Sequence, residues 1–264
     1  MDTLITVGLG FLLGFLIGLT GVGGGALVAP ALYVVLGLDY QVSVALSLIY
    51  SLFTKIVGAI QHMRQGTVLW KITLLYGLAG IPGAVLGSQV VYWADSATQR
   101  IFPFLMGAVL IVVAALILTE SVIASLASRE KPFSPHRITP GGVVAIAGFQ
   151  LVVGMLLGIT SVGSGSLVIL SMLYLFRMSA KEIVGSNIVI ALIMVIPAGL
   201  THYAAGGTNW SVLMLLMVGS LIGTVLGSKA TLVVPERALK FSIAGLIALG
   251  AVSAIIKAWH TAAP

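Results

Sequence analysis

Two short glycine-rich segments interrupt apolar runs and carry the groups that could bind a ligand. Break 1 is Thr20-Gly21-Val22-Gly23-Gly24-Gly25, and break 2 is Thr160-Ser161-Val162-Gly163-Ser164-Gly165. Glycine lets backbone N–H groups approach a ligand, and a helix beginning after such a segment points its positive dipole end toward it. The chemistry predicted at the breaks is therefore non-covalent binding of a small anion. The alternative is that these glycines only allow helices to cross closely.

The candidate binding residues come from both breaks and from the apolar segment that follows each. The breaks contribute Thr20, Gly21, Gly23, Gly24, Gly25, Thr160, Ser161, Gly163, Ser164 and Gly165. Ser47 and Asn187 occupy equivalent places in the following segments, with Ser186 beside Asn187. Asparagine at mid-membrane depth is costly without a partner, so either a ligand or an interhelical hydrogen bond is expected there.

Lys55 is the one cation well inside an apolar segment. It precedes His62, at the expected cytoplasmic end of that segment, by seven residues, or roughly 10 Å along a helix. Lys55 is a candidate attractor for an anion entering from the cytoplasm. The alternative, snorkelling of its side chain to the interface, stays open.

Acidic side chains are confined to termini, loops and segment ends. They are Asp2, Asp39, Asp95, Glu120, Glu130, Glu182 and Glu236. No carboxylate is thus expected at the midplane to bind a proton or a metal cation. The sequence has no cysteine, zinc-protease motif or P-loop, so we expect no metal, no cofactor and no enzymatic activity.

The composition requires a membrane to position these residues. Of the 264 residues 59% are apolar and 8% are charged, with a mean hydropathy of +1.17. Soluble proteins carry about 25% charged residues, so this chain is expected to face lipid rather than water or nucleic acid. The fold class predicted is all-α and polytopic.

The chain repeats itself, because residues 14–88 match residues 154–228 at a constant offset of 140. Break 1 is equivalent to break 2, and His62, Gly66 and Trp70 are equivalent to His202, Gly206 and Trp210. Glycines spaced by four, as in Gly154 and Gly158, are expected to pack helices together. We predict a first transmembrane repeat at 1–120, a linker at 121–140 and a second repeat at 141–264.

Each half begins with two short apolar runs and continues with three longer ones. In the first half the short runs are 4–19 and 26–38, and neither is long enough to span comfortably alone. The long segments are 41–61, 68–93, 98–119, 181–201, 208–230 and 238–259. Each half should therefore hold a broken, re-entrant helical hairpin and three transmembrane helices.

The distribution of basic residues between the two sides of the membrane favours one of two topologies. If the short runs together make one crossing, the two sides hold six basic residues each, without bias. If they form a hairpin, the second half is inverted and one side holds only Arg100 and Lys257. The other side then holds Arg64, Lys71, Arg129, Lys131, Arg137, Arg177, Lys181, Lys229, Arg237 and Lys240. The hairpin topology is favoured, with both termini outside a plasma or inner membrane and the linker cytoplasmic.

The paired motifs GLTGVGGGALVAP and GITSVGSGSLVIL, with ALSL and GSNI after them, resemble the TauE/SafE sulfite-exporter family. The resemblance covers nearly the whole chain. It implies export of sulfite or small organosulfonates, with the two breaks and Ser47, Ser186 and Asn187 as site residues. Leu46 stands where Ser186 does, and Ala26 where Ser166 does, so an asymmetric site is expected.

The sequence thus predicts a secondary transporter with an anion site at the midplane, working by alternating access. Membrane potential alone could drive export of an anion. A sodium- or proton-coupled transporter of small organic acids and a non-transporting membrane receptor are the alternatives. A homodimer is the assembly considered.

Overall fold

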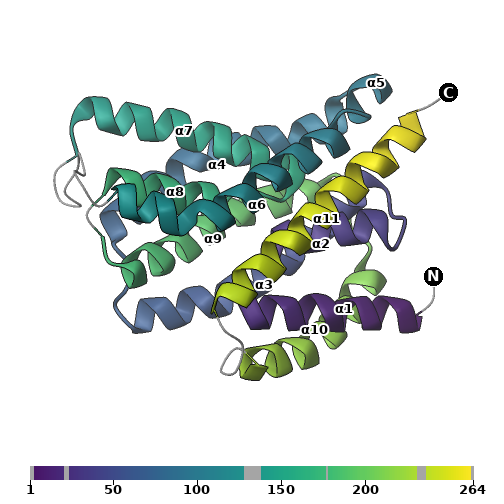
Figure 1. Cartoon of the computed structure of the whole chain (residues 1–264). Coiled ribbons are helices and arrows are strands. Elements are labelled where there is room, and N and C mark those ends of the chain that lie inside the picture. Colours follow the sequence, from purple (N-terminus) through teal and green to yellow (C-terminus); the bar gives the residue numbers. More distant parts are fainter. Residues whose placement is uncertain (1–2, 21–23, 128–137, 177, 231–235, 263–264) are drawn as a thin grey trace.

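The computed structural model describes residues 3–20, 24–127, 138–176, 178–230 and 236–262, and this part of the chain folds into helices without a strand (Figure 1). The helices of the first half are α1 (Thr3–Thr20), α2 (Gly25–Val34), α3 (Tyr40–Arg64), α4 (Trp70–Trp93), α5 (Ser96–Gln99) and α6 (Phe102–Ala127). Those of the second half are α7 (Pro140–Thr160), α8 (Ser166–Leu175), α9 (Ala180–Ala204), α10 (Trp210–Ala230) and α11 (Glu236–Ala262).

Seven helices in the described residues are long and apolar enough to cross a membrane. They are α3, α4, α6, α7, α9, α10 and α11, whereas α1, α2 and α8 are shorter apolar helices. The predicted all-α membrane fold is confirmed. Five of the six long segments predicted from hydropathy correspond to one helix each, with ends that differ by at most three residues, whereas segment 98–119 begins in α5 and ends eight residues before α6 does.

The prediction that neither short run spans alone is wrong for the second half. Helix α7 has 21 residues and is itself a candidate span. It starts at Pro140, whose missing N–H costs nothing in the first turn, and the Thr139 side chain accepts a hydrogen bond from the Gly142 N–H. These signals lie at the predicted boundary between the linker and the second repeat, and the helix continues from there to Thr160 without a break.

Glycines join each first helix to a helix of the other half. Helix α1 packs along α10, and α7 packs along α4. A Cβ on Gly154 would lie 2.2 Å from the Gly80 carbonyl oxygen, and one on Gly87 would lie 2.2 Å from that of Met155. The backbones of α4 and α7 are thus in direct contact, which confirms that the regularly spaced glycines pack helices.

We expect Gly154→Val to destabilise the protein, because no side chain fits between α7 and α4 at this point. Overpacking of this kind costs about 1–3 kcal/mol, so the thermal unfolding midpoint in detergent should fall by several degrees. Gly148→Val is the matched control in the same helix, since a Cβ there meets nothing within 4 Å. Equal midpoints for the two variants would contradict the packing described.

The packing of the two halves is related by exchange of equivalent helices. Helix α2 packs on α11 and its equivalent α8 packs on α6, while α3 packs on α9 and α6 on α11. In Figure 1, α1 begins and α11 ends at the same end of the molecule, and α6 ends at the opposite end, where α7 begins.

One exchange fails. Helix α4 packs along α9, but the equivalent pair, α10 and α3, touches at only a few residues. The two halves are therefore not in the same arrangement, and α3 stands apart from α10 where α9 lies against α4.

Candidate functional site

The two breaks meet in the interior of the molecule. The Gly25 α-carbon, at the start of α2, lies against the carbonyl of Ser161, at the end of α7, because a Cβ on Gly25 would be 2.1 Å from that oxygen. Only glycine allows this approach. Ser161 has a left-handed backbone (φ 62°) and ends α7, with its N–H donating to the Leu157 carbonyl at 2.7 Å.

Hydroxyl groups hold break 2 in place. The Val162 N–H donates to Thr160 Oγ1 at 3.1 Å, and the same hydroxyl donates to the Leu156 carbonyl at 2.7 Å. Ser161 Oγ donates to Ser47 Oγ at 2.9 Å, which ties break 2 to α3 of the other half. Thr160 and Ser47 are fully buried, so they shape the break.

A cavity of about 530 Å³ opens beside break 2. Its polar lining comes from break 2 and from helices α3, α8 and α9: Thr54, Lys55, Ser161, Ser164, Ser166 and Asn187. Its apolar lining includes Ile17, Val113, Ile169, Val184, Ile188 and Ala191. Both halves of the chain therefore contribute to one cavity.

Asn187 is a buried polar residue of the cavity with an unsatisfied side-chain atom. It is 7% exposed, and its Oδ1 has no hydrogen-bond partner among the described residues. A buried unsatisfied acceptor costs about 1–3 kcal/mol, so this amide suits water or a ligand in the cavity.

Lys55 is the only charged side chain among the residues lining the cavity. It is half-buried in α3, and it makes no ion pair with another described residue. An ammonium group held at this depth without an acid favours an anionic ligand over a cation.

The first turn of α8 faces this cavity as well. Gly165 and Ser166 line it, and Gly165 as N-cap provides no side-chain hydrogen bond to the helix. No side chain of the N-cap residue occupies the N–H groups at the start of α8, and the helix dipole adds positive potential there. With a lysine and a helix N-terminus, the cavity has the chemistry of an oxyanion site.

A family model described as Sulfite exporter TauE/SafE matches residues 6–254. The chain belongs to the TauE/SafE family. It is 32% identical over 243 residues to the probable membrane transporter protein YjnA of Bacillus subtilis, covering 90% of this chain and 94% of that protein. It is 26% identical over 259 residues to a probable membrane transporter protein of Xylella fastidiosa, covering 97% of this chain and 96% of that one. No solved structure matches the chain. This TauE/SafE protein is a membrane transporter.

The TauE/SafE cavity gathers half of the residues predicted from the sequence. Those lining it are Gly25, Lys55, Ser161, Gly163, Ser164, Gly165 and Asn187. Four others lie outside it: Ser47 and Thr160 behind break 2, Gly24, and Ser186. Gly21 and Gly23 lie outside the described residues, as does the side chain of Thr20. Their binding roles stay predictions.

Ser186 joins α9 to the start of α4 in the TauE/SafE fold. Its Oγ accepts a hydrogen bond of 3.0 Å from the Leu69 N–H, next to the first residue of α4. Ser186 is fully buried at this contact between α9 and the start of α4. It therefore points away from the cavity that its neighbour Asn187 lines.

Three aromatic or histidine side chains around the TauE/SafE site were missed by the sequence analysis. Tyr40 donates to the Ile159 carbonyl at 2.8 Å, and the fully buried His202 bonds the Gly158 carbonyl at 2.9 Å through Nε2. These carbonyls belong to the last turn of α7, which lacks helical partners for them. Since a carbonyl only accepts, Nε2 carries the proton, and Nδ1 accepts from Tyr92 Oη at 2.8 Å. His202 is thus a buried residue of the last turn of α9.

Tyr50 is the third missed residue of the TauE/SafE site. It hydrogen-bonds Ser220 of α10, and its ring lies against Gly24 of break 1, where a Cβ would be 3.0 Å from Tyr50 Cδ1. Its repeat equivalent is Ile190, so the repeat comparison carried no signal for it. A tyrosine inside an apolar segment, without an equivalent in the other half, is the signal that could have found it.

Proposed function

We propose that the protein exports a small oxyanion, sulfite or an organosulfonate, across the plasma or inner membrane by alternating access. The observation that carries the proposal is the cavity between the halves, which Lys55 and Asn187 line together with break 2. The family supports transport, and the described lining residues, which include a lysine and no acidic side chain, support an anion as the substrate.

Each donor has a role in this proposal. The Lys55 ammonium offsets the charge of the anion, and the Nδ2 group of Asn187 and the first N–H groups of α8 donate hydrogen bonds to its oxygens. Ser164 adds a hydroxyl that makes no hydrogen bond to another described residue. Ser161 contributes through its backbone, because its hydroxyl already donates to Ser47.

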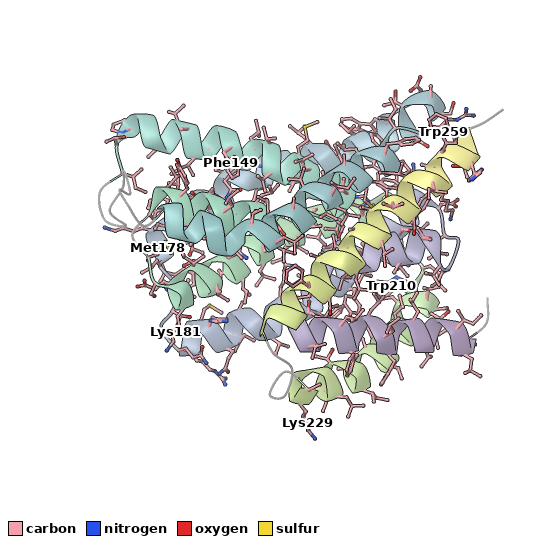
Figure 2. All side chains as sticks on the ribbon, in the orientation of Figure 1. Phe149, Met178, Lys181, Trp210, Lys229 and Trp259 are labelled. Carbon is pink, nitrogen blue, oxygen red and sulfur yellow. The ribbon has the colours of Figure 1, made fainter. Side chains whose placement is uncertain are left out.

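The proposed mechanism uses two inverted halves, residues 1–120 and 141–264, with both termini outside. The shared end of α1 and α11 and the exchange of equivalent helix pairs support this arrangement (Figure 1). In Figure 2, Lys181 lies at the left, away from Trp259 at the upper right, which agrees with a basic cytoplasmic side.

The unequal pairing of helices supports alternating access. The cavity is lined by the C-terminal part of α3 and the N-terminal part of α9, which lie toward the basic side. We assign this arrangement to the inward-open state. Packing α3 along α10 as α9 packs along α4, with the opposite change in the other half, would produce the outward-open state.

Membrane potential is the proposed driving force. Moving an anion out of a negative cytoplasm is favoured by about 2.3 kcal/mol per charge per 100 mV. Flux in proteoliposomes should therefore follow an imposed potential. A flux that ignored the potential and followed a sodium or pH gradient would favour the coupled organic-acid transporter instead.

The test of the site is sulfite binding to purified Asn187→Ala. Losing an amide hydrogen bond to a charged ligand costs about 1.5–3 kcal/mol, so affinity should fall by about 10-fold to 100-fold. Ser186→Ala is the matched neighbour: it should keep the affinity and lower the thermal midpoint, because its hydroxyl bonds Leu69 N–H. Unchanged sulfite binding in Asn187→Ala would contradict the proposed site.

A further inference from the structure

The size of the cavity raises the question of how much of it a bare oxyanion would use. Sulfite has four non-hydrogen atoms and fills roughly the volume of two water molecules, about 60 Å³. The cavity holds about 530 Å³, which lies within the range of sites for organic ligands of drug size, about 300–1,000 Å³. Most of the cavity would therefore hold only water if sulfite were its ligand.

The lining of the cavity divides by chemistry between its helices. The polar groups come from α3, break 2 with the start of α8, and one position of α9. Among the described side chains, α1 and α6 contribute the apolar Ile17 and Val113, and α8 adds Ile169 one turn beyond its polar start. Ile17 and Val113 are buried, at 9% and 3% exposure. They form a closed apolar wall beside the half-buried Ile169, and an apolar part of a ligand would lie against this wall in place of water.

The charge of the lining limits the charge of the ligand. Among the described residues that line the cavity, Lys55 alone is charged, so one negative charge is balanced and a second is left without a partner. A second charge would have to be taken out of water without compensation, which is costly in a largely apolar site. The cavity thus matches one negative charge.

We propose that the cavity binds an organic monoanion, with its oxyanion head at Lys55, Asn187 and the start of α8 and its apolar tail along Ile17, Val113 and Ile169. This inference rests on the proposed anion transport and narrows its substrate class. It selects an organic anion with a tail of several carbons over sulfite, sulfate or a dianion.

The experiment compares alkanesulfonates of increasing length, from methanesulfonate to butanesulfonate, with sulfite, sulfate and ethane-1,2-disulfonate as ligands of the purified full chain. Burial of a CH₂ group contributes about 0.8 kcal/mol, so the affinity should rise about fourfold with each added carbon. The disulfonate, which carries a second charge, should bind at least tenfold more weakly than propanesulfonate.

Two neighbouring valines provide the matched variants. Val113→Thr keeps the shape and puts a hydroxyl on the apolar lining, so it should reduce the gain in affinity per added carbon. Val112→Thr is the control, because Val112 is 49% exposed and does not line the cavity.

The outcomes separate this inference from the proposed function. An affinity that rises with chain length and falls with a second charge supports the monoanion site. Tight sulfite binding with no dependence on chain length would overturn the inference and leave oxyanion transport standing. Binding of none of these anions would overturn both.

Discussion

Gly25→Ala is expected to abolish transport. A Cβ at this position would lie 2.1 Å from the Ser161 carbonyl oxygen, so the two breaks could not stay in contact. The obstacle is backbone, which cannot rotate away as a side chain can. Separating the breaks would displace Ser161 and the start of α8 from the cavity, and with them the groups that bind the anion.

The equivalent glycine of the other half is the matched control. Gly165 is related to Gly25 by the repeat, yet a Cβ on Gly165 meets nothing within 4 Å. Gly165→Ala should therefore keep most of the transport rate. The measurement is anion flux in proteoliposomes, normalised to the amount of monodisperse protein. Equal flux in the two variants would show that the contact between the breaks is not needed.

A milder variant, Ser161→Gly, separates loss of transport from misfolding of Gly25→Ala. Ser161→Gly keeps the left-handed backbone, which glycine adopts freely, and removes only the hydroxyl bonded to Ser47. It should fold and transport at a reduced rate. If Gly25→Ala does not fold while Ser161→Gly transports normally, the contact is structural rather than functional.

Lys55→Gln should weaken anion binding by about 10-fold to 100-fold. A hydrogen bond to a charged group contributes about 1.5–3 kcal/mol, and Lys55 is the only charged side chain of the cavity lining. Lys55→Arg keeps the positive charge and should retain much of the affinity. Isothermal titration with methanesulfonate measures these differences directly.

Lys71→Gln controls for the general basic character of this side of the protein. Lys71 is exposed in the first turn of α4 and does not line the cavity, so its removal should leave the affinity unchanged. If Lys55→Gln and Lys71→Gln behave alike, Lys55 acts at most by attracting anions to the surface, and its predicted place in the site is wrong.

The fold could be predicted from the sequence because lipid imposes simple rules on length and hydropathy. The long segments, the interruption before Gly25 and the packing glycines were all visible in the apolar pattern and in the internal repeat. Helix α7 was the exception, because it was expected to be too short to span the membrane. It has 21 residues and begins directly after its cap at Thr139.

The site was only partly predictable, for a physical reason. Glycine and hydroxyl positions of break 2 can be read from the repeat, and so can the equivalence of Ser47 and Asn187. Whether a hydroxyl faces the cavity or a neighbouring backbone depends on helix rotation, which separates Asn187 in the cavity from Ser186 at Leu69. The bond between Tyr50 and Ser220 has no counterpart in the repeat, since their equivalents are Ile190 and Gly80.

The pairing of α1 with α10 also sets the order in which the chain can mature during synthesis. Residues 3–20 leave the ribosome roughly 10–40 s before residues 210–230, at about 5–20 residues per second. For that interval the glycine-bearing face of α1 has no partner helix. A prematurely terminated chain would keep that face uncovered, a feature by which membrane quality control could distinguish unfinished copies from complete ones.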